Sequence, residues 1–275
     1  MQLVFLLRDL TIIMKRLFYA VIFLLGLIVM VSCEKEEQLP YVEDVCSVIA
    51  NDDFKEYCYR NFDFNHDMKV SMEEAAEVTY IGLLGYRIQA LNGLEYFPNL
   101  EELDCRQCQS TVLDVSSNKK LKTLKCSNNQ LKSLDVSNNP LLELLECGIN
   151  QLTSLDVSNN TRLTGLECRS NQLTSLNVSS LSMLRYLSCG NNQLKSIDLA
   201  QNTQLHTISC RGNMIDTMDL SMTQWILGDQ SMDLGELEPK QGRAKVFVNQ
   251  AQKNKLDDYL SHSAIVYRLD FFLKN

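Results

Sequence analysis

The chain has 275 residues, of which 45% are hydrophobic and 22% are charged, as is ordinary for a globular protein. That length allows one large domain or two small ones. The formal net charge is −8, and because residues 1–32 carry +2, the remaining residues carry −10. Such an acidic body argues against nucleic acid as a partner, since binding phosphates needs a basic stripe or patch.

The first 32 residues have the pattern of a secretory signal. A basic segment begins at residues 14–16, an uncharged apolar run follows over residues 17–31, and Ser32 stands before Cys33. The run is about 15 residues long, whereas a membrane-spanning helix needs roughly 20. We therefore predict a cleaved signal, with an uncleaved membrane anchor as the alternative. Met14 is the predicted start, and the residues before it are an over-long gene prediction or an extended basic region.

The end of this signal resembles a bacterial lipobox, Met-Val-Ser-Cys at residues 30–33, in which the cysteine becomes the lipidated N-terminus. The resemblance implies lipidation of Cys33 and a membrane contact through the lipid alone. The charged tetrad at residues 34–37 is similar to the surface-export signal of Bacteroidetes lipoproteins, although a solvated linker has the same composition. We predict a lipidated tether over residues 33–43 and an outer-membrane protein at the cell surface.

A small helical cap is predicted over residues 44–98, before the repeats described below. A helix is expected to begin at Asp52, with an apolar face that includes Phe54 and Phe62. Cys46 and Cys58 lie on either side of the preceding helix break. A disulfide between them and two free thiols are both compatible with this pattern.

Residues 63–74 resemble the calcium loop of an EF-hand. The resemblance assigns oxygen ligands to Asp63, Asn65, Asp67, Lys69 (through its carbonyl) and Glu74. Met68 departs from the pattern, because the sharp turn at this place usually demands glycine. Ser71 and Glu74 also form a capping box that would begin a helix over residues 72–78. Two interpretations stay open: a weak calcium site, and a degenerate loop that only shapes the cap.

A 21-residue period runs through the middle of the chain without a slip. Its first leucine row is Leu100, Leu121, Leu142, Leu163, Leu184 and Leu205. Its second aliphatic row is Leu103, Leu124, Leu145, Leu166, Leu187 and Ile208. Its cysteine row is Cys105, Cys126, Cys147, Cys168, Cys189 and Cys210. The consensus unit is L-x-x-L-x-C-x-x-N-x-L-x-x-L-D-V-S-x-N, and six copies occupy residues 99–225.

This unit resembles the leucine-rich-repeat family, which implies an α/β repeat solenoid with short parallel strands on its concave face. The asparagine lies where each strand ends, so its amide is expected to pair with backbone groups of the turn. The first copy departs from the consensus at Cys108 and Ser110. A seventh copy fails at Asp229, so the repeats are predicted to end near Trp225.

The cysteine row is predicted to be a column of free, buried thiols, because cysteine in a core behaves as a small hydrophobe. Neighbouring strands are close enough for disulfides, but disulfide torsions fit regular parallel strands poorly. Cys105 and Cys108 form a C-x-x-C pair, which in another context would suggest zinc or redox chemistry. Both positions are already explained by the repeat.

Strand positions that point away from the core form the expected binding face, with candidates at Glu102, Asp104, Arg106, Lys125, Leu144, Glu146, Glu167, Arg169, Tyr186 and Arg211. A plain solvated surface would have the same composition. Glu146 and Glu167 are spaced like a glycosidase pair, but shallow exposed carboxylates are usually only surface. The histidines are far apart in sequence, and no nucleophile is expected beside them. We therefore predict a protein that is not an enzyme.

The last segment, residues 226–275, is predicted to be an α+β cap with strands at 246–248 and 265–272 and a helix at 250–260. A separate ligand domain is the alternative. The predicted function is a lipid-anchored binding or adhesion module that recognises a protein or a glycan. A calcium-responsive module and a structural spacer are the alternatives, a hydrolase is the last choice, and calcium is the only cofactor considered.

Overall fold

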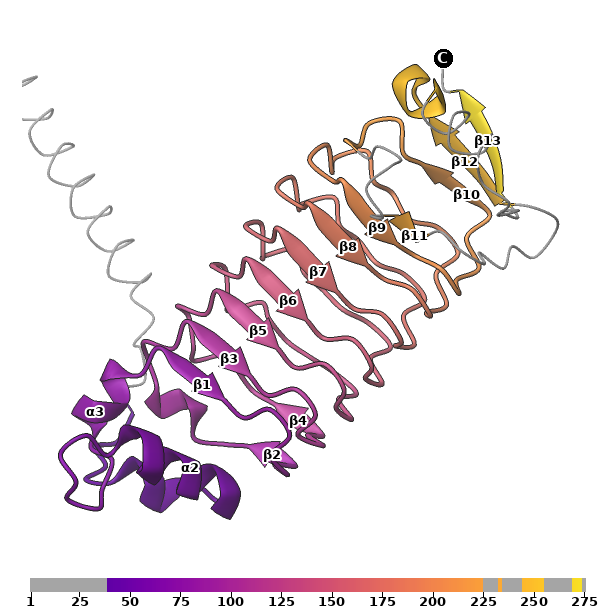
Figure 1. Ribbon diagram of the computed structural model, residues 1–275. Helices are drawn as coiled ribbons and strands as arrows, with labels where there is room; N and C mark the ends of the chain where they lie inside the picture. Colours follow the sequence, from indigo (N-terminus) through magenta and orange to yellow (C-terminus); the bar gives the residue numbers. More distant parts are fainter. Residues whose placement is uncertain (1–38, 225–231, 234–243, 255–268, 274–275) are drawn as a thin grey trace, which may run out of the picture. The chain divides into compact units, whose positions relative to one another are not determined.

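The computed structural model of the chain describes residues 39–224, 232–233, 244–254 and 269–273 (Figure 1). The chain divides into two compact units, residues 1–41 and 42–275, of which the second contains nearly all the described residues. The predicted signal and Cys33 lie outside the described residues. None of the described helices is long and apolar enough to cross a membrane.

The second unit begins with three short helices: η1 (Val45–Val48), α2 (Asp52–Phe62) and α3 (Met72–Glu77). Asn51 caps α2 by accepting a hydrogen bond from the backbone N–H of Phe54 at 2.9 Å. The predicted capping box is confirmed at the start of α3, because Ser71 and Glu74 bond each other's backbone N–H groups. The rings of Phe54 and Phe62 both pack against Phe97, which joins these helices to the first coil.

An eight-stranded parallel sheet runs the length of the solenoid in the order β1-β3-β5-β6-β7-β8-β9-β11 (Figure 1). Its strands are β1 (Tyr80–Gly82), β3 (Glu102–Asp104), β5 (Thr123–Lys125), β6 (Leu144–Glu146), β7 (Gly165–Glu167), β8 (Tyr186–Ser188), β9 (Thr207–Ser209) and β11 (Met232–Asp233). From β3 to β9 each residue pairs with the residue 21 positions later, so Leu145 lies between Leu124 and Leu166. The 21-residue period of the sequence therefore equals the offset between paired residues of neighbouring strands.

The sheet continues one strand beyond each end of the six predicted copies. At the first end β1 pairs with β3, and its outer edge is covered because the hydroxyl of Tyr57 accepts a hydrogen bond from the N–H of Gly82 at 3.0 Å. At the other end β11 pairs with β9. This strand follows Trp225, the residue near which the repeat pattern predicted that the last copy ends. Both extra strands lie out of the 21-residue phase.

Two smaller parallel sheets lie on the return side of the coils. One joins β2 (Ala90–Leu91) to β4 (Val112–Leu113), and the other joins β10 (Thr217–Asp219), β12 (Ala244–Val248) and β13 (Leu269–Leu273). Residues 250–254 are helical, and the amide of Gln252 donates to the carbonyls of Leu220 and Thr223. The described part of the C-terminal segment therefore continues the last coil.

The core is one continuous column, in which the two aliphatic rows and the cysteine row are fully buried. The cysteines of the described residues are free thiols, as the sequence predicts for the ladder. A fully buried leucine contributes roughly 1.5–3 kcal/mol, but no single coil has enough of them to offset its ordering entropy. Each coil is therefore stable only against its neighbours.

A ladder of buried asparagines follows the strands, at Asn129, Asn150, Asn171, Asn192 and Asn213. Asn150 is typical: its amide donates to the carbonyls of Cys126 and Cys147, both at 3.1 Å. Its Oδ1 accepts from the N–H of Leu131, at 3.0 Å. One side chain thus ties together two successive coils, as the sequence predicts for this slot.

The residue before each asparagine-slot residue adopts a left-handed conformation with positive φ, at Gln107, Asn128, Ile149, Ser170, Asn191 and Gly212. This is where the chain leaves the sheet and turns. Ile149, with a φ of 52°, is the least suited, because a β-branched residue is strained in this region. The strain persists because the bonds on both sides of the turn determine the backbone.

A second asparagine ladder, on the return side, consists of Asn118, Asn139, Asn160 and Asn202. Each amide donates to two carbonyls of the coil before it, but each Oδ1 has no hydrogen-bond partner. Leu181 takes the equivalent place in the fourth coil and is fully buried as well. The second ladder is therefore less essential to the coil than the first.

The two ladders should respond differently to the same substitution. We expect Asn150→Leu to lower the free energy of unfolding by about 2–4 kcal/mol, because the buried N–H of Leu131 loses its partner. We expect Asn160→Leu to lower it by less than about 1 kcal/mol, since its two carbonyls keep backbone donors. Urea unfolding of both variants measures the difference, and equal losses would contradict this account.

Candidate functional site

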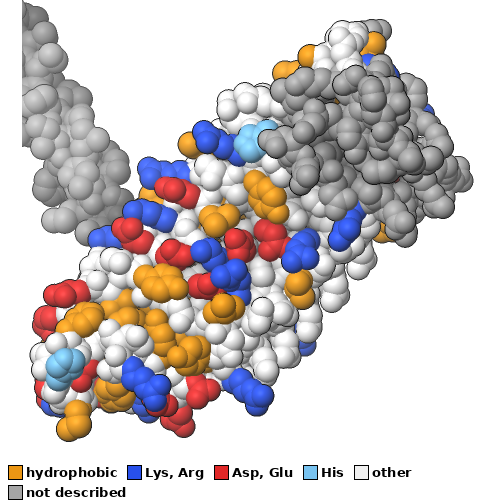
Figure 2. Space-filling model, viewed as in Figure 1, with side chains coloured by type: hydrophobic (Ala, Val, Ile, Leu, Met, Phe, Trp, Pro, Cys, Tyr) orange, Lys and Arg blue, Asp and Glu red, His pale blue; other side chains and the backbone are white. Residues whose placement is uncertain are grey.

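The outward positions of the large sheet form the concave face, and the strand register sets their rows. The row that begins each strand consists of Tyr80, Glu102, Thr123, Leu144, Gly165, Tyr186 and Thr207. Figure 2 shows acidic and basic side chains interleaved over these strands, with hydrophobic side chains among them. Tyr80, which is half exposed, was missed in the sequence because β1 lies out of phase.

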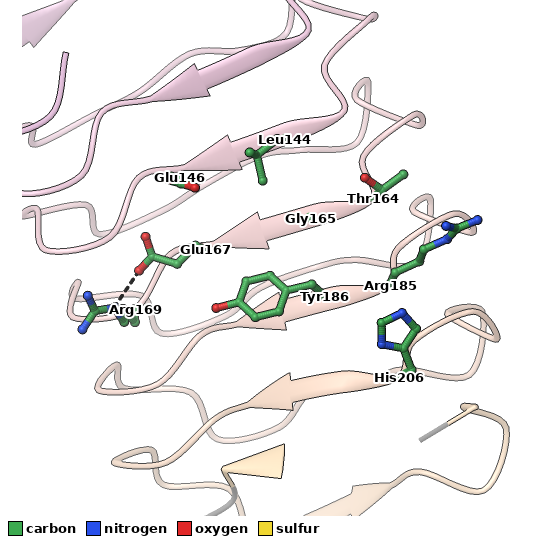
Figure 3. A pocket seen from close by; sticks show the side chains of 9 residues that line it. All are labelled: Leu144, Glu146, Thr164, Gly165, Glu167, Arg169, Arg185, Tyr186 and His206. Atoms are coloured by element: carbon green, nitrogen blue, oxygen red, sulfur yellow. Dashed lines mark hydrogen bonds and ion pairs between the residues drawn. The ribbon is translucent and has the colours of Figure 1, made fainter. Parts of the chain in front are cut away.

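A hollow of about 600 Å³ lies over β6, β7 and β8, and Figure 3 shows the side chains around it. Its lining residues are Leu144, Glu146, Thr164, Gly165, Glu167, Arg169, Arg185, Tyr186 and His206. Five of the ten predicted face residues line it, namely Leu144, Glu146, Glu167, Arg169 and Tyr186. The other five lie outside it: Glu102, Asp104, Arg106 and Lys125 on β3, β5 and the turn after β3, and Arg211 after β9.

The acidic side of the hollow is held in place by neighbouring side chains. Glu167 accepts from the hydroxyl of Ser127 at 2.9 Å and from Nε of Arg169 at 2.9 Å. It reaches Ser127 by crossing over Gly148, where an added Cβ would lie only 2.1 Å from its Oε1. Glu146 has a guanidinium nitrogen of Arg106 at 3.8 Å. Both carboxylates therefore already have a cation of the chain beside them.

The opposite side of the hollow is formed by Thr164, Arg185 and His206, which stand one residue before their strands. Arg185 and His206 are exposed, and Figure 3 shows Arg185 extending outward from the rim. The imidazole of His206 lies 3.1 Å from the hydroxyl of Thr207. The sequence analysis did not include this row in the binding face, because it began the face at the first residue of each strand. The row has the same 21-residue spacing and could have been found in the sequence.

Towards the first coils the concave face is occupied by ion pairs. Arg106 binds Asp104 through two nitrogens at 2.9 and 2.6 Å, and Lys125 binds Glu102 at 2.7 Å. Burial raises the pKa of Asp104, but the hydrogen bonds and charge of Arg106 outweigh it and hold that pKa below its usual value. Asp104 is therefore ionised, and this part of the face is satisfied within the chain.

The EF-hand-like loop uses its oxygens to bind its own backbone. Asp63 accepts from the N–H groups of Asp67 and Met68, and Asp67 accepts from that of Lys69. Met68 adopts a left-handed conformation with a φ of 65°. The sequence indicated this strain, because methionine stands where an EF-hand usually has glycine. Glu74 accepts from the N–H groups of residues 64 and 65 and from its capping partner.

Glu74 is buried, and these hydrogen bonds decide the direction in which its pKa shifts. Burial raises its pKa, but the hydrogen bonds from Ser71, Asn65 and Phe64 outweigh that effect and lower the pKa overall. Within the described ranges, which include this loop, no three His, Cys, Asp or Glu side chains are placed to hold a metal ion. Calcium binding therefore stays a prediction.

The C-x-x-C pair follows the repeat rather than metal chemistry. The thiol of Cys108 donates to the carbonyl of Leu83 at 2.9 Å, which is the bond that an asparagine amide makes in the later coils. Ser110, in a leucine slot, is buried and donates to the carbonyl of Ile88 at 2.5 Å. Burial raises the pKa of Cys108 to about 11, so its thiol is not a ready nucleophile.

Cys46 and Cys58 are both buried and both free in the structure. Burial, together with the neighbouring thiol of Cys46, raises the pKa of Cys58. The disulfide that the sequence left open is therefore not present between them here.

Comparison with known proteins matches no protein-family model and no curated protein. Among solved structures, the chain is similar to internalin C2 from Listeria monocytogenes, with 18% identity and a TM-score of 0.59, over 86% of this chain and 100% of that one. It is also similar to the functional domain of InlJ from the same organism, described as including a cysteine ladder, with 23% identity, a TM-score of 0.32, and coverage of 76% and 57%.

A leucine-rich-repeat protein from Leptospira interrogans is similar at 20% identity, with a TM-score of 0.44 and coverage of 56% of this chain and 51% of that one. The chain thus spans little more than half the length of this protein and of InlJ. The likeness to internalin C2, together with the 21-residue register of the strands, shows that the fold is a leucine-rich-repeat solenoid.

The ladder thiols should make the protein sensitive to alkali. Burial raises the pKa of Cys126, Cys147 and Cys168 well above the usual value. Their stabilising contribution is complete below the pKa of the unfolded thiol, near 8.5, and is lost as the pH rises above it, since only the unfolded chain then releases protons.

We expect each such thiol to lower the unfolding free energy by about 1.4 kcal/mol per pH unit above pH 9. Cys147→Ala should reduce that slope by the same amount, and urea unfolding between pH 8 and 10.5 measures it. An unchanged slope would show that the ladder thiols ionise in the folded state.

Proposed function

We propose that this chain is a binding module that holds a protein partner on the concave face of its solenoid. The observation that carries the proposal is the hollow over β6–β8, where Leu144 and Tyr186 expose apolar surface between charged rows. Tyr186 is 38% exposed although it stands in the middle of the sheet. Exposed aromatic and arginine side chains at the centre of a surface are the residues that most often dominate protein binding.

The rigidity of the face supports this proposal. Backbone hydrogen bonds join every neighbouring pair of strands of the large sheet from β1 to β9, and the asparagine ladder holds the turns after β5, β6, β7, β8 and β9. A partner therefore meets side chains whose positions are already set, and little ordering entropy is lost when it binds. Repeat solenoids in general offer extended concave surfaces of this kind.

A glycan is the second candidate for the same face. The exposed ring of Tyr186 could stack on a sugar, and Glu146 and Glu167 could accept its hydroxyl groups. We favour a protein because Glu167 is already bonded to Ser127 and Arg169, which leaves less of its hydrogen-bonding capacity for a sugar.

The binding proposal is tested by selecting ligands on the purified full-length chain from a phage-displayed library of random 12-residue peptides. We expect Leu144→Ala and Tyr186→Ala to weaken binding of the selected peptides by about tenfold or more, because each removes apolar contact area in the hollow. Thr123→Ala, in the same row but outside the hollow, should leave binding unchanged. Peptides that bind all the variants equally would exclude the concave face.

We further propose that the signal is removed and that Cys33 is lipidated, so that a tether holds the module at the cell surface. The support is the sequence of residues 14–33 alone: a basic start, an apolar run and a lipobox-like end. The acidic charge of the remaining chain agrees with a module that faces solvent rather than an anionic lipid surface.

Metabolic labelling with an alkyne fatty acid in a Gram-negative host tests the anchor. We expect the wild-type chain and Cys46→Ser to become labelled, and Cys33→Ser to remain unlabelled, because only the cysteine after the signal becomes the new N-terminus. External protease should also digest the wild-type chain on intact cells. Label on Cys33→Ser, or none on the wild type, would refute the anchor.

A further inference from the structure

At the floor of the hollow one side chain is missing from the outward face of the sheet, and the end of Leu144 lies over the backbone there. At Gly165 an added Cβ would lie 2.8 Å from Cδ1 of Leu144 and 4.0 Å from Cδ1 of Tyr186. Gly165 is not among the residues with positive φ, so its backbone does not require glycine. The equivalent positions on the adjacent strands are Leu144 and Tyr186, which form the two walls of the gap (Figure 3).

The walls and floor determine what can enter this gap. Leu144 and Tyr186 present carbon atoms, and the floor at Gly165 is backbone already bonded within the sheet. A polar group placed there would lose water without gaining a partner, whereas an apolar group gains contact area. The centre of the hollow therefore favours an aromatic or branched aliphatic side chain.

The two rims differ in charge once the chain's own ion pairs are counted. On the acidic rim, Glu167 is paired with Arg169 and Glu146 has Arg106 beside it. On the opposite rim, Arg185 is exposed, and within the described part of the chain no hydrogen bond or ion pair engages its side chain. Arg106 is shared between Asp104 and Glu146, so the acidic rim is only partly neutralised. The guanidinium of Arg185, next to His206, is the cation of the hollow that a carboxylate of a partner can pair with.

We propose that the hollow receives a protein segment that presents an aromatic or branched aliphatic side chain to Gly165 and a nearby Asp or Glu carboxylate to Arg185. This inference rests on the proposed protein-binding function and names the partner's chemistry. Successive side chains of an extended segment point to opposite faces, so residues two apart lie on the same face, about 6.6 Å from each other. An apolar residue and a carboxylate two positions away can therefore face the two subsites together, and a guanidinium pairs well with a carboxylate.

A panel of capped, fluorescent hexapeptides tests the proposal on the full-length chain by fluorescence polarisation. The reference peptide is Gly-Phe-Ser-Glu-Ser-Gly, in which Phe and Glu share one face, and its three relatives replace Phe by Ala, Glu by Gln, or Glu by Lys. We expect the reference to bind most tightly, with about tenfold weaker binding when Phe becomes Ala or Glu becomes Lys. The peptide with Gln should lie between them.

Two variants of the chain assign the subsites. Gly165→Ala should weaken the reference peptide by about fivefold, because the new methyl group displaces the flexible end of Leu144 into the gap. Arg185→Glu should reverse the charge preference, so that the Lys peptide binds more tightly than the Glu peptide. Lys195→Glu makes the same charge change at an exposed residue outside the hollow and should leave the preference unchanged. Thermal melting checks that each variant is folded.

The inference is overturned if none of the peptides binds at millimolar concentration, if the four bind alike, or if Arg185→Glu leaves the charge preference as it was. It is also overturned if a sugar, and no peptide, competes for the hollow. The wider proposal survives the first three results when library-selected peptides still depend on Leu144 and Tyr186, so the two failures are distinguishable.

Discussion

One interaction determines the rest of this structure: an asparagine amide that bonds the strand ends of two successive coils at once. Asn150 donates to Cys126 and Cys147 and accepts from Leu131, and four other asparagines occupy the same slot in the coils around it. The bonds to Cys126 and from Leu131 cross to the preceding coil, so no coil is complete alone. The same bonds hold the turn in a left-handed conformation that Ile149 would not choose by itself. Buried leucines stabilise the column, but these amides set its pitch and register.

Because the backbone is held so firmly, the shape of the concave face depends on the size of its side chains. Where most positions of this face carry a side chain, Gly165 carries none, and the end of Leu144 lies over its backbone at the floor of the hollow. A glycine acts differently at Gly148, where the missing side chain lets Glu167 cross to Ser127. One glycine thus lies at the floor of the hollow, and the other lets a carboxylate reach a serine of a neighbouring coil. On the acidic rim Arg169 and Arg106 lie beside the carboxylates, whereas among the described residues Arg185 on the opposite rim has no such partner, so the two rims differ in charge.

Periodicity predicted most of the fold, because its signal is repeated six times and each repeat constrains the others. It predicted the strands β3–β9, the buried thiols and the role of the asparagines. It missed β1, where Ile81 precedes its partner Leu103 by 22 residues, and β11, where Met232 follows Ile208 by 24. Half of the candidate face residues line the hollow, but the hollow itself could not be predicted. Its shape depends on Gly165 having two larger neighbours, and its charge on Arg185, which among the described residues has no ion pair of the kind that Arg106 and Arg169 have.

The equal length of the coils has a consequence for how such a chain changes over generations. Removing or duplicating any block of 21 residues between β3 and β9 leaves every ladder continuous, because each slot meets an identical slot in the new neighbour. Recombination within the gene can therefore lengthen or shorten the solenoid in whole coils, and a block that removes β7 would delete the hollow while the remaining coils still stack.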